Sequence, residues 1–176
     1  MKRLIVIGRG LMAEKVAALA APLGYDELRL SEETVALEGG DHVVVAEDDP
    51  DEGRTLLLEV ANGERMPAYL GFAAPHREGW KALVWLAACN VPKARIDLIS
   101  SPAGVDVGAE TPDEVAIAIA AELVAIGHGR PCPSSGLELA TGAGKKTRGV
   151  EARPRRLIGG FARPAVPDDD DSGGRN

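Results

Sequence analysis

A glycine turn close to the amino terminus is the feature that most constrains how this chain can fold. The apolar run Leu4-Ile5-Val6-Ile7 ends at Gly8, and a helical pattern of apolar residues begins at Leu11. A continuous apolar strand is typical of a parallel sheet that is buried on both faces, and glycine lets such a strand turn directly into a helix. This segment therefore predicts an α/β fold.

Strands and helices are predicted to alternate along the chain. Further strands are expected at residues 27–30, 42–46, 68–72 and 95–99. Helices are expected at residues 11–23, 50–60, 80–89 and 115–126, with a turn or a stub of helix between the second and third strands. This order predicts a Rossmann-like domain, in which an open, mainly parallel five-stranded sheet carries helices on both faces.

The clearest helix start is at Thr111. A proline follows it, and Glu114 stands three positions on, so a capping box is expected. The helix behind this start is apolar almost all round, which predicts deep burial.

The charge changes sign along the chain. Residues 1–127 carry 11 Lys and Arg against 21 Asp and Glu, and residues 128–176 carry 9 against 6. An acidic domain lacks the basic face that nucleic acids need, so no nucleic-acid partner is expected. Residues 1–127 are predicted to form a nucleotide- or cofactor-binding domain. Residues 128–176, rich in Gly, Pro and Arg, are predicted to form a largely disordered tail.

The sequence also bears on location. It contains no apolar run long enough to span a bilayer and no signal-peptide pattern, so no membrane association is expected. Cys89 lies among apolar residues and is expected in the core. Cys132, between two prolines, is expected to be an exposed free thiol, which fits a reducing compartment. The prediction is a cytoplasmic protein.

The glycine turn has the spacing of a phosphate-binding loop. The first glycine permits the turn, the second lets a phosphate approach the backbone, and the alanine at the third position lets the helix pack closely. Free amides at the helix start would face the anion. The candidate cofactor-binding residues here are Gly8, Arg9, Gly10, Leu11, Met12 and Ala13. The alternative is that the glycines serve only the turn.

Glu32 stands about twenty residues beyond the turn, where an acid that binds a ribose is expected. A solvated loop acid is the alternative. Glu47, Asp48 and Asp49 follow the third strand and would meet a metal or a ligand hydroxyl, but without His or Cys beside them a helix cap in a charged loop is favoured.

Three other residues are candidates at the same edge of the sheet. His76 and Arg77 follow the fourth strand and would meet an anionic ligand, although a surface loop is favoured. Asp106 lies between apolar residues and needs a hydrogen-bonding partner if it is buried. No nucleophile with a base, and no metal-ligand spacing, is present, so neither a catalytic residue nor a metal site is predicted.

Residues 101–116 carry a resemblance to a known family. The string Ser101-Pro102-Ala103-Gly104-Val105-Asp106-Val107-Gly108-Ala109-Glu110-Thr111-Pro112-Asp113-Glu114-Val115-Ala116 is similar to the signature of the XdhC/CoxI family, maturation factors of xanthine dehydrogenase and related molybdenum hydroxylases. The glycine turn, the Tyr-x-Gly-Phe fourth strand and Val91-Pro92 occur in the family's order. The resemblance covers about residues 2–127.

The resemblance implies a Rossmann domain that binds molybdenum cofactor of the molybdopterin type, or a related nucleotide, and helps deliver it to a molybdenum hydroxylase subunit. The resemblance also places Gly71 at the site, together with the candidate residues named above. Three stretches depart from the family: Leu11 replaces a frequent His, Ala46-Glu47-Asp48 replaces Thr-His-Asp, and the segment 72–77 lacks a basic run. These changes make the mouth of the site apolar and acidic.

Three functions follow as hypotheses. The first is an accessory factor for a molybdenum hydroxylase, more a binding factor than an enzyme. The second is an NAD(P)-dependent oxidoreductase that uses the glycine turn and Glu32. The third is a degenerate domain that acts as an interaction scaffold. The oligomeric state stays open, a homodimer included.

Overall fold

The computed structural model describes residues 1–130 of the 176-residue chain. The predicted tail begins at residue 128, and its residues 131–176, Cys132 among them, lie outside the described residues. None of the helices within residues 1–130 is long and apolar enough to cross a membrane.

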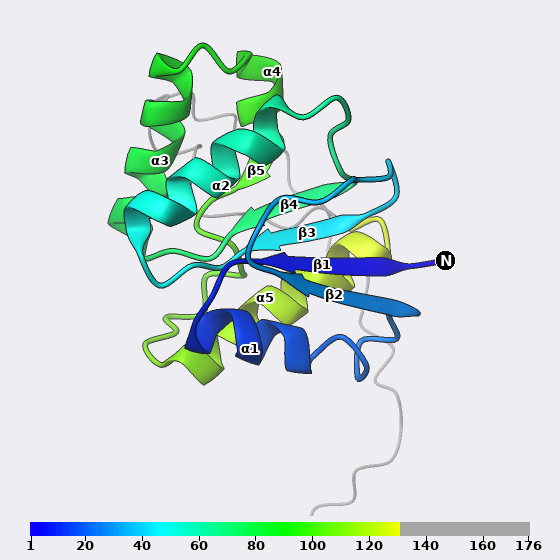
Figure 1. Cartoon of the computed structure of the whole chain (residues 1–176). Coiled ribbons are helices and arrows are strands. Elements are labelled where there is room, and N and C mark those ends of the chain that lie inside the picture. Colours follow the sequence, from blue (N-terminus) through cyan, green and yellow to red (C-terminus); the bar gives the residue numbers. More distant parts are fainter. Residues whose placement is uncertain (131–176) are drawn as a thin grey trace, which may run out of the picture. The chain divides into compact units, whose positions relative to one another are not determined.

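Five parallel strands form one sheet in the order β2-β1-β3-β4-β5 (Figure 1). Val43 pairs with Ile5 on one side and with Leu70 on the other, and all three side chains are buried. From β1 the chain adds β2 on one side, and then adds β3, β4 and β5 on the other side. The carboxyl ends of β1 and β3 therefore border the crevice where open α/β sheets bind ligands. The strands are β1 (Arg3–Ile7), β2 (Glu27–Ser31), β3 (His42–Val45), β4 (Tyr69–Phe72) and β5 (Ile99–Ser100). The predicted five-stranded α/β fold is confirmed.

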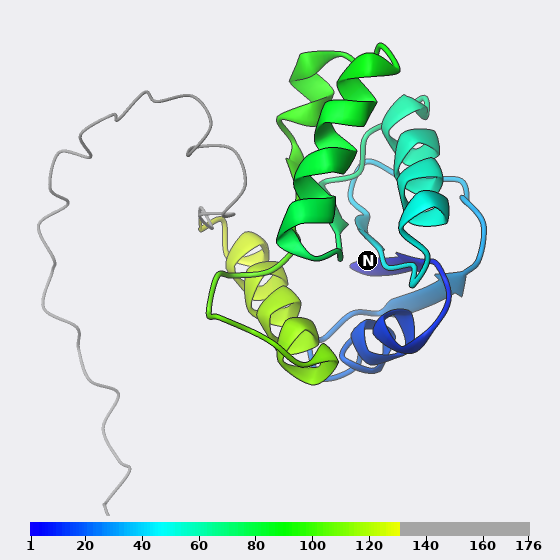
Figure 2. The same cartoon turned by 90° about the vertical axis from the view of Figure 1, so that its left-hand side faces the viewer.

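Helices cover both faces of the sheet and make two separate cores (Figures 1 and 2). α1 (Leu11–Ala18) and α5 (Pro112–Gly127) pack on one face. α2 (Pro50–Asn62), α3 (His76–Ala88) and the short α4 (Lys93–Ile96) pack on the other. Because successive side chains of a strand point to opposite faces, β1 and β3 each contribute to both cores.

The predicted fifth strand is present, but its predicted bounds, residues 95–99, are wrong. Residues Lys93–Ile96 form α4, and β5 has only two residues. Pro92 is the N-cap of this turn, with an extended ψ of 134°, so the preceding segment ends there. The Arg95 guanidinium then donates to the carbonyls of Ala61 and Gly63, at 2.7 and 2.8 Å. These contacts with the end of α2 stabilise a helical turn that the apolar pattern alone does not indicate.

Between β2 and β3 the structure has an irregular loop with a turn at Gly39 and Gly40, closed by a hydrogen bond from the Asp41 amide to the Glu38 carbonyl at 3.1 Å, so the turn alternative of the prediction is confirmed. Three further predictions need correction. α1 ends at Ala18 rather than at residue 23, and turns continue to Gly24. Cys89 is only partly buried. Ile117 and Val124 on α5 are 62% and 43% exposed, because only one side of this helix packs on the sheet.

Two polar pairs, one partly buried and one buried, lie at the amino-terminal end of the sheet. Arg3 donates two hydrogen bonds to Asp41, at 2.8 and 2.6 Å. Burial alone would raise the pKa of Asp41, but the hydrogen bonds from Arg3 hold it below its usual value. The Tyr25 hydroxyl lies 2.6 Å from Nδ1 of His42. Burial raises the pKa of Tyr25 to about 12 and lowers the pKa of His42.

Candidate functional site

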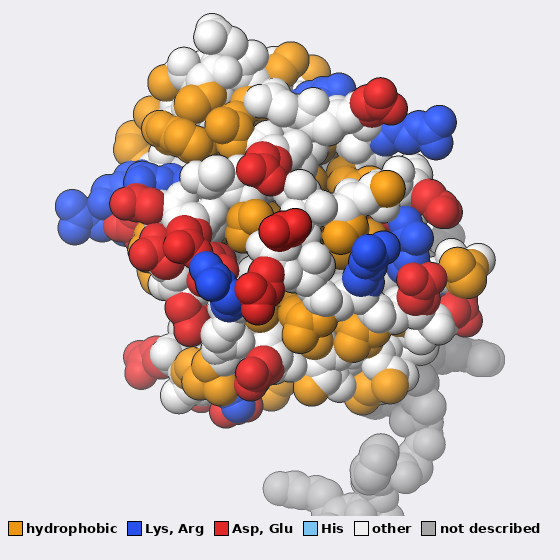
Figure 3. Space-filling model, in the orientation of Figure 1, with side chains coloured by type: hydrophobic (Ala, Val, Ile, Leu, Met, Phe, Trp, Pro, Cys, Tyr) orange, Lys and Arg blue, Asp and Glu red, His pale blue; other side chains and the backbone are white. Residues whose placement is uncertain are grey.

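A cleft of about 670 Å³ lies at the carboxyl ends of the strands. Its walls include Met12 at the start of α1, Glu47 and Asp48 after β3, residues 73–76 up to the start of α3, and the loop of residues 102–110. Most of the lining is alanine, valine, proline or glycine, and the charged side chains are nearly all acidic. Figure 3 shows acidic side chains gathered at this end of the sheet, on the left. The cleft is therefore apolar inside with an acidic rim.

The loop that walls the cleft is tied to the sheet and to α5. The Ala103 amide donates to the Phe72 carbonyl at 2.8 Å, and the Val105 amide donates to the Ala118 carbonyl at 3.2 Å. Gly104 between them has a φ of 108°, and a Cβ there would lie 3.1 Å from the Ile119 amide nitrogen. Only glycine allows the loop to approach α5 so closely. The segment that carried the family resemblance thus forms one wall of the cleft.

A buried carboxylate below this wall was missed by the sequence analysis. Glu122 is 2% exposed and accepts hydrogen bonds from three separate elements. The Tyr69 hydroxyl donates at 2.9 Å, the Ser100 hydroxyl at 2.6 Å and the Gly104 amide at 2.5 Å. One signal was available in the sequence: Glu122 is the single ionisable residue of the apolar stretch from Val115 to Gly127. Such a residue is buried only with partners.

The glycine turn joins β1 to α1 with the expected backbone. Gly8 and Gly10 have φ angles of 131° and 93°. A Cβ on Gly8 would overlap the carbonyl of Ala46 at the end of β3. The close approach of two strand ends therefore accounts for this glycine without any ligand. Gly8 and Gly10 lie beside the cleft and are not part of its described lining.

Carboxylates surround Arg9 in the turn. Its side chain contacts Glu52 at 2.5 Å, Glu47 at 3.7 Å and Glu32 at 3.9 Å. The hydrogen bond with Glu52, and the charge of the other two acids, raise the pKa of Arg9. Glu32, predicted as the ribose-binding acid, is exposed and lines a shallow acidic hollow of about 350 Å³ with Glu47 and Glu52. Arg9 is thus engaged by the protein's own acids.

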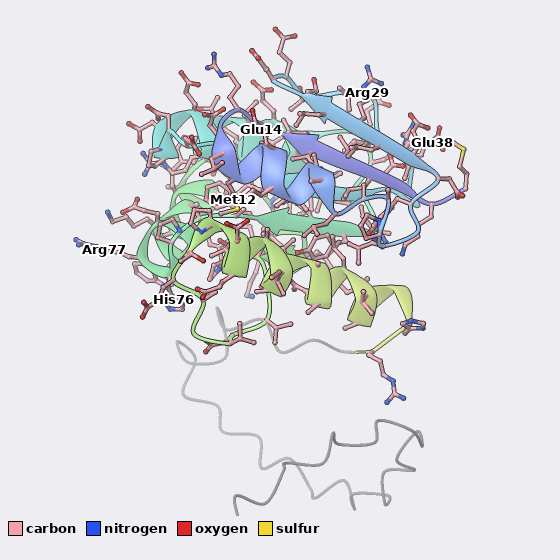
Figure 4. All side chains as sticks on the ribbon, turned by 90° about the horizontal axis from the view of Figure 1, so that it is seen from below. Met12, Glu14, Arg29, Glu38, His76 and Arg77 are labelled. Carbon is pink, nitrogen blue, oxygen red and sulfur yellow. The ribbon has the colours of Figure 1, made fainter. Side chains whose placement is uncertain are left out.

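The surface loop expected for His76 and Arg77 is wrong. These residues form the first turn of α3, which begins four residues earlier than predicted, directly after Pro75 at the N-cap. No side chain within residues 1–130 caps this helix, so its first amides are open to an acceptor. His76 lines the cleft, and Figure 4 shows Met12, His76 and Arg77 at the same end of the molecule.

The remaining candidates separate into two groups. Asp106 lines the cleft but is exposed, so the partner expected for a buried acid is not needed. Gly71 is buried in β4, where the Tyr69 ring fills the space beside it. Leu11 is 51% exposed and Ala13 is buried in the core under α1. The candidates that the fold brings together around the cleft are thus Met12, Glu47, Asp48, His76 and Asp106.

No metal site is apparent in the part of the chain that the structure describes, where no group of three His, Cys, Asp or Glu residues could hold an ion. Asp49, one of the three acids after β3, caps α2 instead. Its carboxylate accepts hydrogen bonds from the amides of Asp51 and Glu52, which hold the pKa of Asp49 below its usual value.

Comparison with known proteins gives a family and a fold. None of the curated proteins matches the chain. Among solved structures, the chain is similar to a Bacillus halodurans protein described as a xanthine dehydrogenase, with a TM-score of 0.57 and 19% identity. That similarity covers 74% of this chain and 44% of the other, so this chain spans less than half of that protein's length. A family model described as the XdhC Rossmann domain matches residues 4–123. The chain therefore belongs to the XdhC Rossmann-domain family.

Proposed function

We propose that this protein is an accessory factor that binds molybdenum cofactor of the molybdopterin type in the cleft and assists the maturation of a molybdenum hydroxylase, without turnover of its own. Membership of the XdhC Rossmann-domain family supports the proposal. The single observation that carries it is the cleft itself, because the loop with the family signature forms its wall.

The chemistry of the lining fits such a ligand at one end. A volume of about 670 Å³ is within the range of small-molecule sites. A pterin ring is flat, and one of its edges carries adjacent N–H donors. Ala73, Ala103 and Val115 offer apolar surface to the ring. Asp48 and Asp106 are exposed and line the cleft, and their carboxylate oxygens can accept hydrogen bonds from such an edge.

The start of α3 fits the other end of the ligand, its phosphate. Open amides at a helix start and the positive end of the helix dipole attract an anion. His76 lines the cleft at this point, and Arg77 follows it in the same helical turn. The cofactor is cargo in this proposal, and its molybdenum chemistry belongs to the enzyme that receives it.

The nicotinamide alternative has weaker support. A dinucleotide needs its diphosphate at the glycine turn and its ribose on Glu32. Arg9 is already engaged by three carboxylates, Glu32 among them. We therefore advance no second function.

Direct binding tests the proposal. Purified protein is titrated with molybdopterin-type cofactor, and any ligand that co-purifies is identified by mass spectrometry. Arg77→Glu is expected to weaken binding at least about tenfold, because it reverses the charge beside the start of α3, where the phosphate would lie. Arg29→Glu is the matched control, since Arg29 is exposed on β2, far from His76 in Figure 4. Absence of binding, or equal effects of the two substitutions, would refute the proposal.

A further inference from the structure

The glycine turn stands at the position where a dinucleotide fold binds phosphate, yet its own neighbours occupy it. It follows β1, precedes α1 and lies at the reversal point of the sheet between β1 and β3. In that position backbone amides ordinarily face a phosphate group. Here two carboxylates from the end of β3, those of Glu47 and Asp48, face the turn.

Glu47 is fixed in place by the backbone. Its side chain is only 5% exposed, and one oxygen accepts a hydrogen bond from the Arg9 amide at 2.9 Å. Its other oxygen accepts from the Asp49 amide at 3.4 Å. A donor of the turn is thus already satisfied by an internal anion.

Asp48 fills the space that the second glycine leaves open. A Cβ on Gly10 would overlap the Asp48 carboxylate. In a phosphate-binding turn this is the side from which the phosphate approaches the backbone. Asp48 is exposed as a residue, so its carboxylate holds this position while facing solvent.

The surrounding charge strengthens the exclusion. Arg9 is the one cation among the described residues that contact the turn's acids, and it is shared between Glu32, Glu47 and Glu52. With Asp48 the acids outnumber it, so the turn has a net negative charge. A diphosphate at this place would meet like charges within a few ångströms.

We propose that Glu47 and Asp48 are specificity determinants that exclude diphosphate-bearing nucleotides from the glycine turn. A phosphate of any ligand in the cleft would then bind at the start of α3, where His76 lies. This inference goes beyond the proposed function, because the exclusion holds whichever ligand the cleft takes.

Gain of binding tests the inference. ADP and inorganic pyrophosphate are titrated calorimetrically into the wild-type protein, into Asp48→Asn and into the double variant Glu47→Gln/Asp48→Asn. Wild-type protein is expected to show no binding at about millimolar ligand, and the double variant to bind at least about tenfold more tightly than that limit. Asp48→Asn is expected to lie between them. Added salt should weaken the gained binding.

Asp97→Asn is the matched control, because it removes one negative charge from an exposed ion pair with Lys93 at the other end of the sheet. Three outcomes would overturn the inference: binding by the wild type, no gain in either variant, or an equal gain in the control. Thermal melts confirm folding, and Asp48→Asn decides alone if the double variant is unfolded, since Asp48 is exposed. No molybdenum cofactor enters the experiment, so failure here is distinct from failure of the proposed function.

Discussion

The substitution Glu122→Ala should destabilise the domain more than the same substitution at an exposed glutamate. The carboxylate accepts hydrogen bonds from Tyr69, Ser100 and Gly104, whose hydroxyl or amide groups come from three different elements. Alanine removes this acceptor from the Ser100 hydroxyl and the Gly104 amide and opens a cavity beside them. A buried donor that loses its partner costs about 1–3 kcal/mol.

The loss of partner for the Ser100 hydroxyl and the Gly104 amide alone costs about 2–6 kcal/mol. We therefore expect the free energy of unfolding to fall by about 4 kcal/mol. At about 3–4 °C per kcal/mol for a domain of this size, the melting temperature should fall by about 12–16 °C. Glu122→Gln keeps the volume and one acceptor oxygen, and its loss should be smaller, about 1–2 kcal/mol.

Urea unfolding followed by circular dichroism measures the loss, with Glu33→Ala as control because Glu33 is exposed. The control should stay within about 0.5 kcal/mol of the wild type. Native-state hydrogen exchange gives a local readout, since the Gly104 amide donates directly to Glu122 and should lose protection. A stability loss in Glu122→Ala no larger than in the control, with Gly104 still protected, would refute the reasoning.

Two further predictions concern the sheet. Burial lowers the pKa of His42, so the folded state favours the neutral imidazole. The free energy of unfolding should be highest above about pH 6.5, the pKa of histidine in the unfolded chain. It should decline as the pH falls from there through the lower pKa of the folded state. Urea midpoints between about pH 7.5 and 5 measure this decline, which should flatten in His42→Gln; an unchanged slope would count against it. Gly8→Ala should cost at least about 2 kcal/mol, because its φ of 131° disfavours a side chain and the new Cβ would overlap the Ala46 carbonyl. Gly39→Ala, which meets open space, is the control, and equal thermal melts of the two variants would contradict the prediction.

Local patterns were enough to predict much of the fold. The apolar run of β1, the glycine turn and the capping box at Thr111 each depend on residues close together in sequence. Their periodicity and cap chemistry are properties of a short segment, so they can be read without knowing the neighbours. The family signature of residues 101–116 was also legible in this way, and the family model over residues 4–123 confirms the recognition.

Contacts between distant segments decided what the patterns did not. Residues Lys93–Ile96 became α4 because Arg95 reaches carbonyls more than thirty positions away, at the end of α2. Ile117 is exposed because one face of α5 is left uncovered, which depends on how many elements surround a helix. Propensity cannot foresee either outcome, since tertiary packing overrides it.

The sequence by itself determined the α/β fold, the family and the glycine turn, because strand pattern, cap and signature are local. Only the tertiary structure decided what faces that turn. Glu47 and Asp48 are nearly forty residues from Gly10 in the chain, and the pairing of β3 with β1 brings them to it. The turn has the spacing of a phosphate site, but its Arg9 amide donates a hydrogen bond to the Glu47 carboxylate. Electrostatic interactions depend on distance in space, which the sequence alone does not give.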